Sequence, residues 1–172
     1  MNIGCDAETA GRELQTFSRN FYERPRVAAA LIALQDKAGL DVNLVLFAIW
    51  LGLSGRGRLT DQKLDLAERA VFSMRVEVIE PLRALRRRLK TIADADIQRL
   101  RERIQAVEIE AEEAAQLRLA DIAGAPLTAA PNLAAAEANL DCYLGRAKAG
   151  SAYAAIICGE LRRLCETDDP GG

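Results

Sequence analysis

The chain has 172 residues and contains no histidine, and this absence narrows the chemistry that it can perform. Without an imidazole there is no Ser-His-Asp or Cys-His mechanism, no two-histidine zinc helix and no histidine pH switch. The four cysteines never form C-x-x-C, so neither a thiol redox motif nor a zinc ribbon is predicted. We therefore expect no catalytic residues, no metal site and no cofactor.

Aromatic residues are scarce, at 5% of the chain, although half of the residues are hydrophobic. Strands favour aromatic and β-branched residues, so a composition dominated by Ala, Leu, Arg and Glu predicts helices instead. A chain of this length with this apolar content suits one domain with its own core. The sequence therefore predicts a single all-α domain over residues 1–172, with six or seven helices.

An excess of positive charge is also missing, since the net charge is −2 and the isoelectric point is about 5.4. Nucleic-acid-binding domains are usually basic, so a nucleic-acid partner is not predicted. The N-terminal stretch lacks a basic region followed by an apolar one. The most apolar stretch, residues 42–53, is far shorter than the roughly 20 residues that span a bilayer. We expect a cytoplasmic protein with reduced cysteines and no membrane span.

Helical periodicity is what the chain does contain. Apolar residues recur at steps of three and four through most of the sequence, which is typical of amphipathic helices. We predict helices near residues 8–22, 25–38, 42–53, 61–90, 94–122, 133–147 and 152–166, with a kink or split at Pro81. Residues 1–8 and 167–172 are expected to be disordered, and residues 123–131 form an internal linker.

The predicted helix at 94–122 carries a heptad-like seam. The seam residues are Ile97, Leu100, Ile104, Val107, Ala111 and Ala114. Dense Arg and Glu residues flank the seam, so we predict a long charged hairpin over residues 61–122, in which this helix folds back on the preceding one. The same seam could instead close between two chains, which keeps a homo-oligomer as an alternative.

Three polar residues interrupt the apolar segment that surrounds the predicted central helix at 42–53. Asp41 is suited to cap that helix, Asn43 lies in its first turn, and Gln35 falls within the apolar arc of the preceding helix. Buried polar groups need partners, because an unsatisfied one costs about 1–3 kcal/mol. We predict that the three meet at the corner between the two helices, either as a buried structural network or as the lining of a ligand pocket.

A second candidate region is the stretch EPLRALRRRLK at residues 80–90. At helical spacing Arg83, Arg86, Arg87 and Lys90 fall within one arc, and Arg88 points elsewhere. Positive charge near a helix C-terminus is favoured by the macrodipole, so a solvated helix end paired with the Glu-rich helix explains the cluster. The alternative is a site that binds an anion or docks an acidic partner, since Arg grips carboxylates and phosphates with two bonds.

Two stretches together suggest a family: FYERPRVAAALIALQDKAGLDVNLVLFAIWLGLSG and, further on, VIEPLRALRRRLK. They resemble a small, mainly proteobacterial family known only as a domain of unknown function, with the similarity extending over about residues 17–165. The resemblance implies a short, all-helical cytoplasmic protein. It implies no catalytic residues, so it supports the two candidate regions without naming an activity.

Two functional hypotheses follow. The first is a non-enzymatic interaction, adaptor or regulatory protein that docks a protein partner on the charged hairpin. The second is a small-molecule binding protein or enzyme with a pocket at Gln35, Asp41 and Asn43, whose arginines attract an anionic ligand. A cavity beside Gln35 and Asn43 would favour the second hypothesis.

Overall fold

The computed structural model describes residues 3–127, 131–148 and 151–167, which form helices joined by loops, with no strand among them. In chain order the helices are α1 (Ile3–Tyr22), α2 (Pro25–Ala38), α3 (Val42–Leu53), α4 (Asp61–Met74), η1 (Arg75–Ile79), α5 (Glu80–Leu89), α6 (Ala95–Ala123), α7 (Leu133–Arg146) and α8 (Ser151–Thr167). The π-helical segment η1 joins α4 to α5 without a break, so the described chain has seven helical rods. The prediction of an all-α domain is confirmed.

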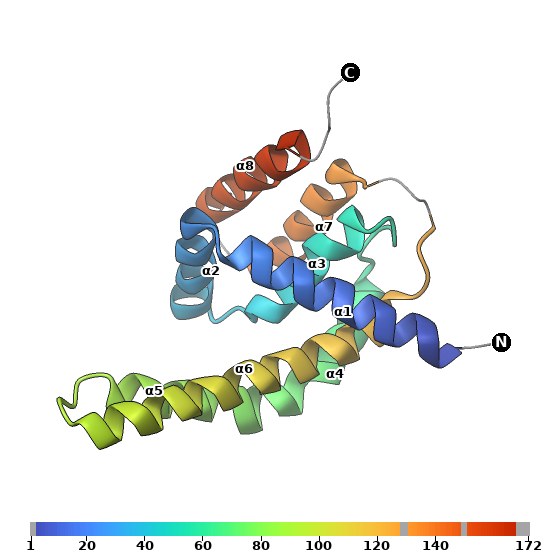
Figure 1. The fold of residues 1–172 in the computed structure, drawn as a ribbon. Helices are drawn as coiled ribbons and strands as arrows, with labels where there is room; N and C mark the ends of the chain where they lie inside the picture. Colours follow the sequence, from blue (N-terminus) through green and yellow to red (C-terminus); the bar gives the residue numbers. More distant parts are fainter. Residues whose placement is uncertain (1–2, 128–130, 149–150, 168–172) are drawn as a thin grey trace.

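Helix α3 is the centre of the domain, as its apolar sequence predicted. Every residue from Asn43 to Gly52 is buried, because α1, α2, α6 and α7 surround the helix (Figure 1). Its closest neighbour is α7, and Gly52 makes that approach feasible. A Cβ atom on residue 52 would lie only 2.2 Å from the backbone nitrogen of Ala136.

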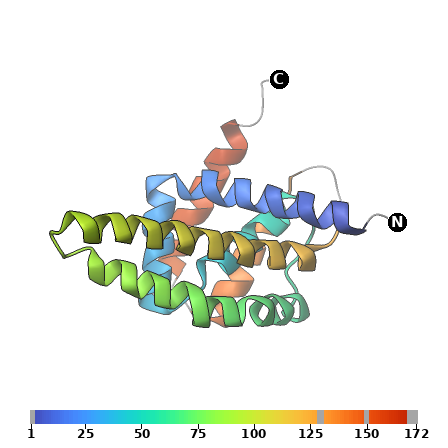
Figure 2. The ribbon, with the colours of Figure 1, turned by 60° about the horizontal axis from the view of Figure 1, so that its bottom comes forward.

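The rod formed by α4, η1 and α5 runs antiparallel to α6, and the turn between them projects beyond the other helices (Figures 1 and 2). The predicted charged hairpin is therefore present. Its heptad seam closes only in part, since Ala111 is buried whereas Leu100 and Val107 remain 49% and 48% exposed. Helix α6 packs against α1 as well as against α4 and α5. Because these neighbours lie on different sides of α6, a single apolar seam cannot be buried against all of them.

The helix bounds agree with the predicted bounds except at the N-terminus. Helix α1 begins at Ile3, so residues 3–8, which were expected to be disordered, are helical. This stretch contains Gly4, which disfavours helix, but it has no proline, and Ala7 and Glu8 favour helix. The linker begins at Gly124. The predicted C-terminal tail beyond residue 167 lies outside the described residues.

Candidate functional site

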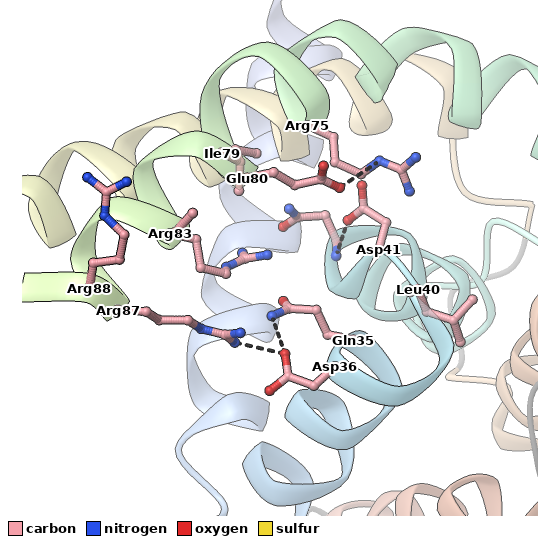
Figure 3. Close-up of a pocket in the computed structure, with 13 residues that line it drawn as sticks. Gln35, Asp36, Leu40, Asp41, Arg75, Ile79, Glu80, Arg83, Arg87 and Arg88 are labelled. Atoms are coloured by element: carbon pink, nitrogen blue, oxygen red, sulfur yellow. Dashed lines mark hydrogen bonds and ion pairs between the residues drawn. The ribbon is translucent and has the colours of Figure 1, made fainter. Parts of the chain in front are cut away.

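A cavity of about 540 Å³ opens where the corner between α2 and α3 faces the segment formed by η1 and α5 (Figure 3). Its lining comprises Gln35, Asp36, Gly39, Leu40, Asp41, Asn43, Arg75, Ile79, Glu80, Arg83, Ala84, Arg87 and Arg88. The whole predicted polar set and two members of the predicted basic set, Arg83 and Arg87, therefore lie in one place. The sequence identified the two regions separately, and only the hypothesis of a pocket with arginines at its mouth brought them together.

The corner is built by local backbone geometry. Helix α2 ends at Gly39, whose φ of 65° is left-handed and favours glycine. The backbone N–H of Asp41 then donates to the Tyr143 hydroxyl of α7 (3.2 Å), which anchors the turn to the core. The Asp41 carboxylate begins α3 as its N-cap, because its Oδ1 accepts from the Asn43 N–H at 2.8 Å.

The opposite wall contains the π-helical turn η1. In this turn the Glu80 N–H donates to the Arg75 carbonyl, five residues back, in place of the usual four. The wide turn lies directly before Pro81, which has no N–H to donate and would clash with a regular preceding turn. The predicted disturbance at Pro81 is thus present as a wide turn, and it brings Arg75 onto the same wall as Glu80 and Arg83.

Asp41 is the most unusual residue of the lining. Only 6% of it is exposed, and its second oxygen, Oδ2, has no hydrogen-bond partner among the described residues. Burial raises the pKa of this carboxyl, although the backbone N–H groups of Asn43 and Leu44 and the positive charges of Arg75 and Arg83 act in the opposite direction. Figure 3 shows the carboxylate directed from the start of α3 toward the wall that carries Arg75 and Glu80.

Asn43 and Gln35 lie beside Asp41 but have different partners. The Asn43 side chain is buried, and its Oδ1 accepts from the Gln116 Nε2 of α6 at 2.9 Å. The half-buried Gln35 donates from Nε2 to Asp36 Oδ1 at 3.3 Å. The three predicted polar residues therefore share a cavity, and no hydrogen bond joins the side chain of Gln35 to the other two.

The predicted basic set divides between two environments. Arg83 donates from Nε to Glu108 of α6 at 2.9 Å and also pairs with Glu112, while Arg86 pairs with Glu108 and does not line the cavity. Lys90 is exposed and does not line the cavity. The two arginines are thus bound to the glutamates of the hairpin, which is the pairing that the sequence offered as one explanation of the cluster.

This ion-pair cluster has opposite effects on its two carboxyl groups. Burial acts to raise the pKa of Glu108, but hydrogen bonds from Arg86 and Arg83 outweigh it, and the pKa is lowered. The pKa of Glu112 is raised, first by burial and also by the charge of Glu108, against the opposing charge of Arg83. Glu108 is therefore the ionised centre of the cluster.

Several lining residues were missed by sequence reasoning. Asp36 was not among the predicted polar residues, yet it lines the cavity and its carboxylate accepts from Arg87 at 2.8 Å. Arg75 and Glu80 form a looser pair at 3.6 Å. Arg88 was placed outside the basic arc but lines the cavity, and within the described residues it forms no ion pair. A stripe through residues 80, 84 and 88 has helical spacing, but only the position of α2 and α3 shows that it faces a cavity.

Comparison with known families gives a clear assignment. The model of the family described as "Protein of unknown function (DUF2390)" matches residues 13–119. The chain belongs to this family. The match includes every cavity-lining residue and the supporting Glu108, Glu112 and Gln116, and it ends before α7, so the family resemblance is confirmed over both candidate regions. No curated protein and no solved structure matches the chain.

Two further findings describe the DUF2390 chain. Among the residues that the structure describes, none of the helices has both the length and the hydropathy needed to cross a bilayer. Within the same residues, no three Cys, Asp or Glu side chains gather where they could hold a metal ion. The polar groups that line the cavity are carboxylates, amides and guanidinium groups.

Proposed function

We propose that this protein binds a small polar molecule in the cavity between the α2–α3 corner and the η1–α5 segment. The observation that carries the proposal is Asp41 Oδ2, a buried carboxylate oxygen on the cavity wall without a hydrogen-bond partner. Leaving such an atom unsatisfied costs about 1–3 kcal/mol or more. A bound molecule that donates a hydrogen bond to this oxygen would remove that cost.

The surroundings of Asp41 support the same proposal. Its backbone is held by Tyr143 and by the first turn of α3, so the carboxylate is positioned before any ligand arrives. Preorganisation of this kind lowers the entropic cost of binding. A cavity of about 540 Å³ is also within the size range of small-molecule sites.

The test compares the wild-type protein with Asp41→Asn in a thermal-shift screen of polar metabolites, together with native mass spectrometry of the purified protein. Asparagine caps helices as well as aspartate does, so α3 should keep its start. We expect at least one compound to raise the melting temperature of the wild type and to shift the variant much less. The proposal fails if no added or co-purified molecule distinguishes the two proteins.

A protein-interaction role remains the second candidate, supported by the exposed part of the hairpin. Leu100 and Val107 lie one heptad apart on α6, and about half of each is exposed. Among the predicted docking residues, Arg83 and Arg86 are held by Glu108, which weakens the case for an acidic partner at that position. The apolar pair instead suits a second copy of the same helix.

The second candidate predicts a change of mass in solution. Light scattering after gel filtration should find a dimer for the wild type and a monomer for the double variant Leu100→Glu and Val107→Glu. A wild-type protein that stays monomeric at high concentration would contradict self-association through α6. Neither Leu100 nor Val107 lines the cavity, so the response of the double variant in the ligand screen should remain that of the wild type.

A further inference from the structure

The arginines that face the cavity are already paired with carboxylates. These ion pairs join Arg75 to Glu80, Arg87 to Asp36, and Arg83 to Glu108 and Glu112 of α6. Arg88 also lines the cavity, but Figure 3 shows its side chain directed away from Asp41. Among the described residues an anionic ligand therefore meets no unpaired cation beside Asp41, and the charge of Asp41 repels it.

A cationic ligand is opposed by the wall that faces Asp41. The positive charges of Arg75 and Arg83 already act on the Asp41 carboxylate. A ligand cation at Asp41 Oδ2 would approach both of these charges. The lining as a whole offers a cation no net attraction, since it contains four arginines against the carboxylates of Asp36, Asp41 and Glu80.

The group that Asp41 lacks is a hydrogen-bond donor. Its Oδ1 accepts from the Asn43 N–H, whereas its Oδ2 accepts from no donor among the described residues. An O–H or N–H group of an uncharged ligand supplies that hydrogen bond without separating an existing ion pair and without adding a charge to the cavity. Moving an uncharged polar group out of water also costs much less free energy than moving an ion.

We propose that the ligand of this cavity is an uncharged molecule whose hydroxyl or carboxamide group donates a hydrogen bond to Asp41 Oδ2. This inference rests on the proposed function, because it assigns a chemical class to the molecule that the cavity binds. Asp41 selects the hydrogen-bond donor, and the positive charge of Arg75 selects against a cation.

The test is isothermal titration calorimetry with two sets of probes that match in shape and differ in charge. Benzamide, benzoate and benzamidine carry a neutral, a negative and a positive group on the same ring. Glucose, glucuronate and protonated glucosamine make the same comparison on a sugar, so the two sets distinguish a carboxamide from a hydroxyl. In at least one set we expect the uncharged probe to bind about tenfold more tightly than both charged probes, because an opposed charge in a site costs at least that much.

Two cavity variants and one control separate the hydrogen bond from the charge. In Asp41→Asn the side-chain oxygen caps α3, so an amide NH₂ group takes the position of Oδ2 and faces the donor of the ligand. This variant should weaken the uncharged probe about tenfold. Arg75→Gln removes a charge that opposes cations, so it should tighten the cationic probe about threefold and leave the uncharged probe unchanged. Arg69→Gln is the matched control, because Arg69 is exposed on α4 and does not line the cavity, and it should change neither affinity.

The inference is overturned if a charged probe binds as tightly as the uncharged probe in every set that binds, or if Asp41→Asn leaves the uncharged probe bound. A circular dichroism melt of each variant confirms that lost binding is not lost folding. If none of these probes binds, the compound that shifts the wild type and not Asp41→Asn decides. An uncharged compound supports the inference, whereas a charged one overturns it and leaves the proposed function standing. If no compound distinguishes the two proteins, both fail.

Discussion

Helices α3 and α5 are of similar length but are held in the domain by different forces. All residues of α3 from Asn43 to Gly52 are buried, and the helix lies so close to α7 that no side chain fits at Gly52. No residue of α5 is fully buried, and its arginines attach it to the glutamates of α6. Close packing therefore positions α3, whereas α5 is held by half-buried side chains together with ion pairs.

The cavity lies between these two kinds of structure, and each contributes a different property. The α3 side supplies Asp41, whose position is determined by the packed core. The α5 side supplies arginines on flexible side chains, of which Arg87 is half exposed and pairs with Asp36 at the surface. Packed elements resist displacement, whereas exposed ion pairs contribute little and can exchange partners. The cavity therefore has a rigid wall on the α3 side and an adjustable wall on the α5 side.

The largest expected effect is at the packed interface. Gly52→Ala should lower the free energy of unfolding by about 3 kcal/mol, because the new Cβ would overlap the backbone of Ala136. Urea denaturation measures the loss. Gly145→Ala in α7 is the matched control, since nothing lies near its Cβ position, and it should raise stability by about 0.5 kcal/mol. Equal effects at both positions would show that α3 and α7 are less tightly packed than described.

The next effect concerns the ion pairs of the hairpin. Glu108→Ala should cost about 2 kcal/mol at neutral pH, because it removes the common partner of the partly buried Arg83 and Arg86. Glu8→Ala removes an exposed pair with Arg12 and should cost less than about 0.5 kcal/mol. Urea denaturation of both variants gives the comparison, and a Glu108→Ala protein as stable as Glu8→Ala would mean that packing alone holds α5.

The same variant has a defined pH dependence. The pKa of Glu108 is lower in the folded protein than its ordinary value of 4.5, so the unfolded chain binds the proton more readily. Its contribution to stability is therefore complete above pH 4.5 and is lost as the pH falls through the lowered pKa. The difference in unfolding free energy between the wild type and Glu108→Ala should shrink on acidification.

A smaller effect separates the two predicted amide residues. Asn43→Leu should cost about 1–2 kcal/mol, because it leaves the buried Gln116 without its acceptor. Gln35→Leu should change stability by less than about 0.5 kcal/mol, since Gln35 is only half buried and its bond to Asp36 is long. Thermal melts of the two variants test this order. If Gln35→Leu cost more stability than Asn43→Leu, the structurally important polar residue would be on α2 and not on α3.

The last effect is a gain in stability. Asp41→Asn should raise stability at neutral pH by about 0.5–1 kcal/mol, because it removes a buried charge and keeps the cap. Burial raises the pKa of Asp41 above 3.8 on folding, although the charges of Arg75 and Arg83 act in the opposite direction. Tyr143 and Glu112 are the neighbouring titratable groups whose charge interacts with that of Asp41.

The pH dependence at Asp41 has the opposite sign to that of Glu108. Because the folded state binds this proton more readily, the wild type should lose stability as the pH rises from 3.8 through the raised pKa. The variant should lack that component. Urea denaturation of both proteins across this range measures it, and parallel pH profiles would contradict the ionised, unpartnered carboxylate on which the proposed site depends.

Local patterns in the sequence determined the helices and several of their ends. Apolar spacing of three and four residues specifies a helix without knowledge of its neighbours, and the cap at Asp41 was found for the same reason. The central position of α3 also followed from its sequence, because a helix that is apolar on all sides is stable only when it is surrounded.

The partners of the polar residues were decided only by the tertiary structure. Helical spacing grouped Arg83 with Arg86, but in the structure Arg83 lines the cavity whereas Arg86 pairs with Glu108. Arg87 and Arg88 also line the cavity, although the sequence placed Arg88 outside the basic arc. The unsatisfied oxygen of Asp41 could not be predicted either. An N-cap pattern predicts that one carboxylate oxygen accepts from the helix, but it does not predict the surroundings of the other oxygen. Periodicity is a property of neighbours along the chain, whereas a cavity is enclosed by segments that are distant in sequence, so its position depends on how the helices pack.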